Sequence, residues 1–373
     1  MTIDRTTTGA WLPGDPPGQR SFASLDRRFT FETGDTLDDI TVAYETWGEL
    51  SPSRSNAVLV LHALTGDSHA HGHAGAGHPT DGWWDRMIGP GAPLDTNHYF
   101  VVCPNVLGGC QGTTGPASPA ADGRPYGSRF PWITPRDQVD VEIALADHLG
   151  IDRWRAVVGG SMGGMRVLEW CVGAPERVEQ AVVVAVGAYA TAEQIGQSST
   201  QNRVILADPN FHGGDYYDRP PGPAHGLRLA REVGQLSYRS EIEFHRRFHR
   251  KPQGDEDPMR GGRYAIESYL QHHGEKLLSR FDANTYLVLS TCMNHHDVGR
   301  GRGGPAEALR AVTADVTIAG ISTDRLYPLR LQYELAELLA RAGGVDVIDS
   351  LDGHDAFLTE TEAVGKVIRR TLG

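Results

Sequence analysis

The sequence predicts an α/β fold, in which helices cover both faces of a mostly parallel sheet. Short, continuous apolar runs rich in β-branched residues recur along the chain, as is typical of strands buried on both faces. Helical periodicity separates several of these runs, for example over residues 138–149 and 166–172. This alternation favours parallel strands joined by helices. The runs that we assign to buried strands are 58–61, 100–103, 154–158, 182–186 and 316–319, and we predict a further strand at 345–348.

Two further regions complete the expected organisation. Residues 1–25 are polar and rich in Gly and Pro, which favours a loose arm. Residues 29–32 and 40–48 alternate apolar and polar side chains around a turn at 33–35, which predicts a hairpin at the edge of the sheet.

The segment 189–300 interrupts the alternation of strands and helices. It carries helical patterns over 227–236, 264–272 and 276–281 and no convincing buried strand. We therefore expect a core made of residues 1–188 and 301–373, with residues 189–300 inserted as a mostly helical cap.

Charge and cysteine content exclude several classes of function. The 373 residues carry a formal net charge of −12 without a basic run, which disfavours nucleic acid or an anionic membrane as a partner. The four cysteines lie far apart, so a disulfide framework or a zinc site is not expected. The N-terminus lacks a signal-peptide core, and no apolar run is long enough to cross a bilayer. These features predict a cytoplasmic protein.

The strongest functional motif is Gly159-Gly160-Ser161-Met162-Gly163, which lies between a predicted buried strand and a predicted helix. A sharp turn from strand to helix is the context that the G-x-S-x-G motif of a nucleophilic serine requires. A chance match in a glycine-rich chain would lack this context. A phosphate-binding loop would need a following Gly-Lys-Ser/Thr, which is absent. Ser161 is therefore predicted to be the nucleophile of an α/β-hydrolase fold.

A serine hydroxyl needs a base to accept its proton and a carboxylate to orient that base. In this fold the acid and then the histidine follow the serine along the chain, each on a loop after a later strand. Asp324 and His354 meet both conditions. Asp352 and Asp355 are rival acids, but they share the loop of His354, whereas the acid normally comes from a different strand. Asp324 could instead cap a helix, and His354 could be an ordinary loop histidine.

Two further sets of groups follow from the fold. The backbone N–H groups of Leu64 and Met162 are the expected donors to the oxyanion that forms during acyl transfer. The loop with His69, His71, His73 and His78 invites a metal site, but it is rich in Gly and Ala and no acidic or thiol ligand completes a set. We expect a flexible loop there and no metal.

Five stretches of the sequence match motifs of one family within this fold. The chain closely resembles the homoserine O-acetyltransferases of methionine biosynthesis over nearly its whole length. One position departs from the pattern, because Ala356 stands where many members have Gly. The matching stretches are residues 61–68, 105–110, 159–164, 324–328 and 353–358.

The resemblance implies a two-step transfer without a cofactor. Ser161 would accept the acetyl group of the co-substrate acetyl-CoA and pass it to the γ-hydroxyl of L-homoserine. Arg231 would hold the homoserine carboxylate with Tyr238 assisting, and Asp355 would receive the α-ammonium group. Without the resemblance, we would interpret Arg231 as a solvent-exposed charged residue on a helix and Asp355 as an acidic residue of a loop. The family also implies a homodimer associating through the cap.

Other functions remain open on the sequence alone. A plain serine esterase would use the same triad, and a non-catalytic binding protein could share the fold. A succinyl donor or a serine acceptor would need only small changes in the pocket, which spacing does not identify.

Overall fold

The computed structural model describes residues 3–373, so the first two residues of the predicted arm lie outside the described part of the chain. Its centre is an eight-stranded sheet with the order β1-β4-β8-β5-β9-β10-β11-β12. The six strands from β8 to β12 in this order pair in parallel, whereas β4 is antiparallel to both β1 and β8. The strands of the sheet are β1 (Ser21–Leu25), β4 (Ile40–Trp47), β5 (Ala57–Leu61), β8 (Phe100–Pro104), β9 (Trp154–Gly160), β10 (Val178–Val184), β11 (Asp315–Ile321) and β12 (Ala342–Ile348).

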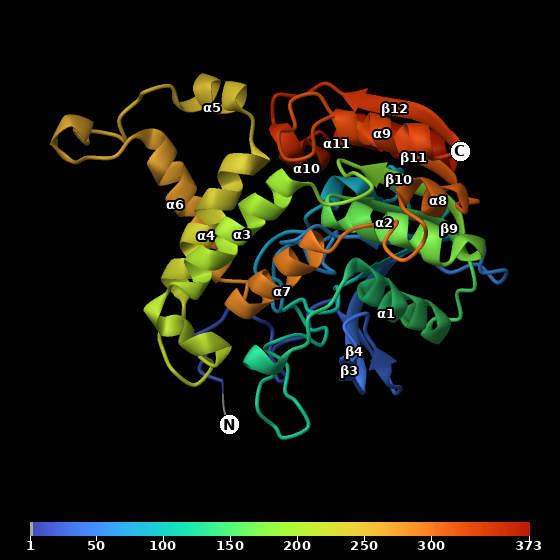
Figure 1. Cartoon of the computed structure of the whole chain (residues 1–373), viewed down its shortest axis with the longest axis horizontal. Coiled ribbons are helices and arrows are strands. Elements are labelled where there is room, and N and C mark those ends of the chain that lie inside the picture. Colours follow the sequence, from blue (N-terminus) through green and yellow to red (C-terminus); the bar gives the residue numbers. More distant parts are fainter. Residues whose placement is uncertain (1–2) are drawn as a thin grey trace.

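Helices cover both faces of this sheet, as the sequence predicted (Figure 1). Along β5, Leu59 and Leu61 pack into one core cluster and Val58 and Val60 into the other, because successive side chains of a strand point to opposite faces. The helices on the first face are α1 (Pro135–His148), α2 (Met162–Gly173), α8 (Pro305–Arg310) and α9 (Arg330–Leu338); α10 (Ala356–Thr359) and α11 (Thr361–Leu372) contribute to the second.

Between β10 and β11 the chain leaves the sheet and forms a group of helices beside it (Figure 1). Within the described residues, this stretch contains no strand. α4 packs against both α3 and α6, and α3 also packs against α7, so these helices form a unit of their own. The helices are α3 (Ala192–Leu206), α4 (Ala224–Tyr238), α5 (Glu241–Phe248), α6 (Ala265–Leu278) and α7 (Ala283–Asn294).

Three details of the sequence prediction are wrong. Ile40–Trp47 does not form an edge hairpin with residues 29–32; it lies inside the sheet, and the short strands β2 (Phe29–Thr30) and β3 (Thr36–Leu37) pair separately. The edge strands are β1 and β12, and β1 lies in a segment that we expected to be a loose arm. The two helical patterns over 264–281 are a single helix, α6, followed by a turn.

The remaining short elements lie mainly in connecting segments. No helix in residues 3–373 is both long enough and apolar enough to cross a membrane. These elements are the strands β6 (Ile88–Gly89) and β7 (Leu94–Asp95) and the 3₁₀ turns η1 (Asp85–Met87), η2 (Gly127–Arg129), η3 (Pro175–Arg177), η4 (Pro209–Gly214), η5 (Pro258–Arg260) and η6 (Gly353–Asp355).

Candidate active site

Ser161 occupies the sharp turn between β9 and α2. Its backbone has φ 56° and ψ −126°, a conformation that L-residues with a side chain rarely adopt. The turn is held by the Ser161 N–H, which donates to the Val184 carbonyl at 3.0 Å. The strain keeps the hydroxyl at the carboxyl edge of the sheet, ahead of the first turn of α2.

The glycines around Ser161 allow this turn to pack closely. A Cβ atom on Gly159 would lie 2.6 Å from the carbonyl carbon of Gly163, and a Cβ on Gly163 would collide with the Leu61 carbonyl oxygen. Both neighbours are backbone atoms, which cannot move aside as a side chain can. The nucleophile turn and the loop after β5 are therefore in contact only because these positions lack side chains.

Gly163→Ala is expected to destabilise the protein by about 1–3 kcal/mol, because the added methyl group overpacks a contact between two backbone segments. Gly196→Ala is the matched control: Gly196 lies in α3, and no atom lies within 4 Å of the place that its added methyl group would take. That change should stabilise by roughly 0.5–1 kcal/mol through helix propensity. Urea unfolding of both variants measures the difference, and equal stability of the two would contradict the packing argument.

Asp324 and His354 are brought together from two separate loops. Asp324 follows β11, and its Oδ1 accepts the backbone N–H groups of Leu326 and Tyr327, each at 2.8 Å. Its Oδ2 lies 2.7 Å from Nδ1 of His354, which sits in η6 after β12. Two fixed donors therefore aim the carboxylate at the imidazole.

The environment of His354 sets its proton affinity. Burial alone would lower the pKa of His354, but the Asp324 carboxylate opposes this effect and the pKa is raised above its ordinary value. The ring stacks on Tyr327, with centroids 5.1 Å apart. Nε2 is buried and has no hydrogen-bond partner within residues 3–373, Ser161 included. An unpaired Nε2 is the atom that would accept the proton of a nucleophile.

Ser161 and His354 open into one cavity between the sheet and the cap helices. Its floor includes Leu64 and Thr65 of the loop after β5. Within the described residues, the N–H groups of Leu64 and Met162 donate no hydrogen bond to the protein. Both therefore remain available to a ligand, and the N–H of Met162 adds the positive end of the α2 dipole.

Arg231 and Tyr238, both on α4, also line this cavity, as does Asp355. The Arg231 guanidinium lies over the Tyr238 ring, 5.0 Å from its centroid. No carboxylate pairs with Arg231 in the part of the chain that the structure describes. Burial raises the pKa of Asp355, while Arg231, His354 and Arg239 oppose this shift. The cavity that contains Ser161 thus also offers a guanidinium without a carboxylate partner and a carboxyl group.

One group of cavity residues was not predicted. A polar stripe on α3 lines the cavity, and α7 adds further polar side chains next to it, with Ser198 of α3 donating to Asn294 of α7 at 2.7 Å. The i, i+3, i+4, i+7 spacing of the stripe was visible in the sequence, but a polar stripe normally indicates the solvent-facing side of a helix. The residues are Gln194, Gln197, Ser198 and Gln201 on α3 with Ser290 and Asn294 on α7.

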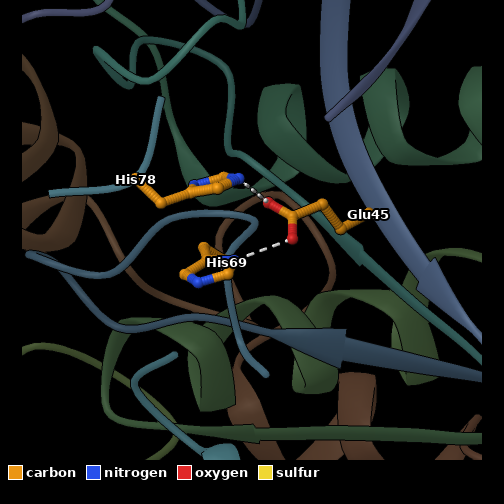
Figure 2. A group of neighbouring side chains, drawn as sticks. All are labelled: Glu45, His69 and His78. Carbon is orange, nitrogen blue, oxygen red and sulfur yellow. Dashed lines mark hydrogen bonds and ion pairs between the residues drawn. The ribbon is translucent and has the colours of Figure 1, made fainter. Parts of the chain in front are cut away.

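The histidine loop differs from our expectation of a flexible segment. His69 and His78 are buried, and Glu45 of β4, distant in sequence, supplies the acidic group that the loop lacks (Figure 2). His69 Nδ1 lies 2.9 Å from Glu45 Oε2, and His78 Nε2 accepts the Gln19 N–H at 2.9 Å.

The distances among these three side chains would suit a metal ion, but the orientation of the rings does not. The His69 and His78 rings are stacked, with centroids 3.8 Å apart and planes at 12°. Their in-plane lone pairs therefore lie in two nearly parallel, separate planes and do not converge on one ion. As arranged, the hydrogen bond from His69 to Glu45 ties the loop to β4, and His78 stacks on His69 with its Nε2 3.6 Å from the Glu45 carboxylate.

Comparison with known proteins agrees with the fold. The family model described as alpha/beta hydrolase fold matches residues 56–361, which defines the class of protein. A homoserine O-acetyltransferase of Thermobifida fusca (strain YX) is 57% identical over 366 residues, covering 98% of this chain and 97% of the relative. The chain belongs to the homoserine O-acetyltransferase family and is an acyltransferase.

Solved structures include both transferases and esterases. The homoserine O-acetyltransferase from Bacillus anthracis is 29% identical with a TM-score of 0.86, over 95% of this chain and 97% of that one. Esterase E22 also has a TM-score of 0.86, at 26% identity over 95% of this chain and 99% of that one. The fold is thus shared by enzymes that use different acyl acceptors.

Proposed function

We propose that the protein transfers the acetyl group of acetyl-CoA to the γ-hydroxyl of L-homoserine, giving O-acetyl-L-homoserine and CoA. The observation that carries the proposal is the unpaired Arg231 in the cavity of Ser161 and His354. A planar guanidinium suits a carboxylate that arrives with the substrate. High identity to relatives named homoserine O-acetyltransferase supports the same substrate.

The first half-reaction acylates the enzyme. Ser161 Oγ attacks the thioester carbonyl while His354 Nε2 takes the hydroxyl proton, and Asp324 stabilises the resulting imidazolium. The N–H groups of Leu64 and Met162 donate to the oxyanion of the tetrahedral intermediate. The C–S bond then breaks, and CoA leaves as the thiol with the proton from His354.

The second half-reaction reverses these roles. Arg231 holds the homoserine carboxylate with Tyr238 beside it, and Asp355 receives the α-ammonium group. His354 takes the γ-hydroxyl proton as that oxygen attacks the acetyl-Ser161 carbonyl. The Ser161 oxygen then leaves and regains its proton from His354. All proton and acyl transfers use groups of the chain, so the reaction needs no cofactor.

We also propose that this step belongs to methionine biosynthesis, in the cytoplasm, and that the enzyme acts as a homodimer through residues 189–300, the inserted cap. Large apolar side chains exposed on or beside the cap helices support this contact. They are Ile195, Leu206, Leu236, Ile242 and Met259. Sedimentation analysis of the wild-type chain and of Met259→Ser tests the assembly.

The substrate proposal is tested by crossing two donors with two acceptors. Purified enzyme is given acetyl-CoA or succinyl-CoA with L-homoserine or L-serine, and the products are identified by mass. We expect O-acetyl-L-homoserine as the main product. A preferred succinyl donor or serine acceptor would overturn the assignment, and thiol release that does not depend on homoserine would indicate an esterase.

Arg231→Ala is expected to lower kcat/KM for homoserine by about 10–100-fold, the cost of removing one charge-assisted hydrogen-bonding group. Acylation by acetyl-CoA should remain nearly unchanged, because Arg231 acts on the acceptor. The control is Arg228→Ala on the same helix, where Arg228 already pairs with Glu232 at 2.8 Å. Rapid-quench measurement of each half-reaction separates the two effects; equal loss in both would refute the assignment to homoserine.

A further inference from the structure

The oxyanion loop after β5 contains a buried histidine that the mechanism above does not use. His62 is 1% exposed and immediately precedes Ala63 and Leu64, which both line the cavity. The carbonyl of the Ala63–Leu64 peptide, Ala63 C=O, lies 2.8 Å from Nδ1 of His62. It also accepts the Gly66 N–H at 2.9 Å. In the Ala63–Leu64 peptide, the carbonyl thus lies within hydrogen-bond distance of two groups, whereas the N–H donates to no protein group among the described residues.

The hydrogen-bond partners of His62 determine which ring nitrogen carries the hydrogen. Nε2 lies 3.0 Å from the Val106 N–H, which is a donor, so Nε2 is the acceptor. Nδ1 must then carry the hydrogen and donate to the Ala63 carbonyl. Burial, with the nearby Arg166 cation, lowers the pKa of His62 to about 3, so the ring is neutral at physiological pH.

The loop is also anchored behind His62. Arg166 of α2 is fully buried; it donates to the His62 carbonyl and pairs with Glu142 of α1. Trp170 Nε1 donates to the other carboxylate oxygen of Glu142 at 2.8 Å. The backbone of the loop is therefore fixed to α2, the helix that begins just after Ser161. The His62 side chain and the Gly66 N–H then both restrain the rotation of the Ala63–Leu64 peptide through the Ala63 carbonyl.

We infer that His62 is a positioning residue for the oxyanion hole: its Nδ1–H holds the Ala63 carbonyl so that the Leu64 N–H points at the reacting acyl oxygen. Donors on a carbonyl polarise the whole peptide, which strengthens the N–H at its other end. A donor that is already oriented stabilises the transition state more than one that must rotate into place during the reaction. This inference rests on the proposed function, because it assigns Leu64 N–H to the oxyanion.

Two substitutions of His62 distinguish the role of Nδ1 from the role of Nε2. The amide nitrogen of His62→Asn can take the place of Nδ1 and donate to Ala63, whereas the amide oxygen of His62→Gln can reach only toward the Val106 N–H. We expect His62→Asn to keep kcat within about tenfold of wild type, and His62→Gln to lose about 10²-fold or more, as for removal of one oxyanion donor. KM for homoserine should change little in either, because Arg231 and Asp355 are untouched.

His78→Gln is the matched control for the loss of a buried histidine, since His78 Nε2 also accepts a backbone N–H and does not line the cavity. It should lower the free energy of unfolding as His62→Gln does, with kcat unchanged. A second readout is inhibition by methylboronic acid, whose adduct with Ser161 places an oxygen in the oxyanion hole. Its inhibition constant should rise in His62→Gln and not in His78→Gln.

Equal kcat in His62→Asn and His62→Gln, or a wild-type inhibition constant in His62→Gln, would overturn the role of His62. Either result would leave the proposed function intact if the wild-type enzyme still makes O-acetyl-L-homoserine. Absence of acetyl transfer by the wild-type enzyme would refute the proposed function itself.

Discussion

Ser161→Ala is expected to abolish acetyl transfer, with kcat lowered by about 10⁴-fold or more, because no other group in the cavity replaces the nucleophile. Incubation of wild-type enzyme with acetyl-CoA should add the mass of one acetyl group to the peptide that contains Ser161. The variant should show no such addition. The intact mass and the digest after a short incubation without homoserine measure this directly.

The fold of Ser161→Ala should be unaffected, since alanine meets the same backbone strain as serine and removes only an oxygen. Ser279→Ala, a change at an exposed serine after α6, is the control for protein quality and should retain full activity. Acetylation of Ser161→Ala at the wild-type rate would place the covalent step on another residue. A fully active variant without acyl-enzyme would mean direct transfer between the two substrates.

Asp324→Asn is expected to lower kcat by about 10⁴-fold, the loss that follows when the base is held in the wrong tautomer. Asn Oδ1 can keep the two backbone N–H bonds that position Asp324, so its amide N–H₂ will face His354 Nδ1. Nδ1 then becomes the acceptor and Nε2 carries the hydrogen. A protonated Nε2 cannot take the proton of Ser161.

The pH dependence supplies a second measurement on the same variant. In the wild type, activity is lost as the pH falls through the raised pKa of His354, since only the neutral ring acts as a base. Removal of the Asp324 charge lowers that pKa, so the acidic limb of kcat/KM should move to lower pH. Asp352→Asn, the rival acid on the His354 loop, should leave both kcat and the limb unchanged. If Asp352→Asn lowered kcat and shifted the pH dependence while Asp324→Asn changed neither, Asp352 would be the acid that orients His354.

The sequence could predict the candidate triad because each part has a local signal. Glycines and an apolar strand precede Ser161, Asp324 follows a recognisable buried strand, and His354 follows a short run that predicts a strand. The order of these strands in the fold then brings the loops together. Leu64 was placed in the same way, by its position after β5.

Other parts of the site had no local signal. His62 looked like an ordinary residue at the end of a strand, because its role depends on a neighbouring carbonyl and on Val106, which lies in another loop. The stripe on α3 looked like a solvated helix face until α7 and the cavity covered it. Glu45 joins His69 and His78 only because β4 lies inside the sheet.

The α/β class, the nucleophile turn and the family of this protein could all be predicted from the amino-acid sequence. A strand buried on both faces appears as a continuous apolar run, and a strained nucleophile turn appears as glycines around the serine. Both patterns involve residues that are adjacent in the chain. Three features required the folded structure: the edge position of β1, the lack of a carboxylate partner for Arg231 among the described residues, and the ring nitrogen of His62 that carries the hydrogen. These features depend on contacts between segments far apart in the chain, for which local patterns carry no information.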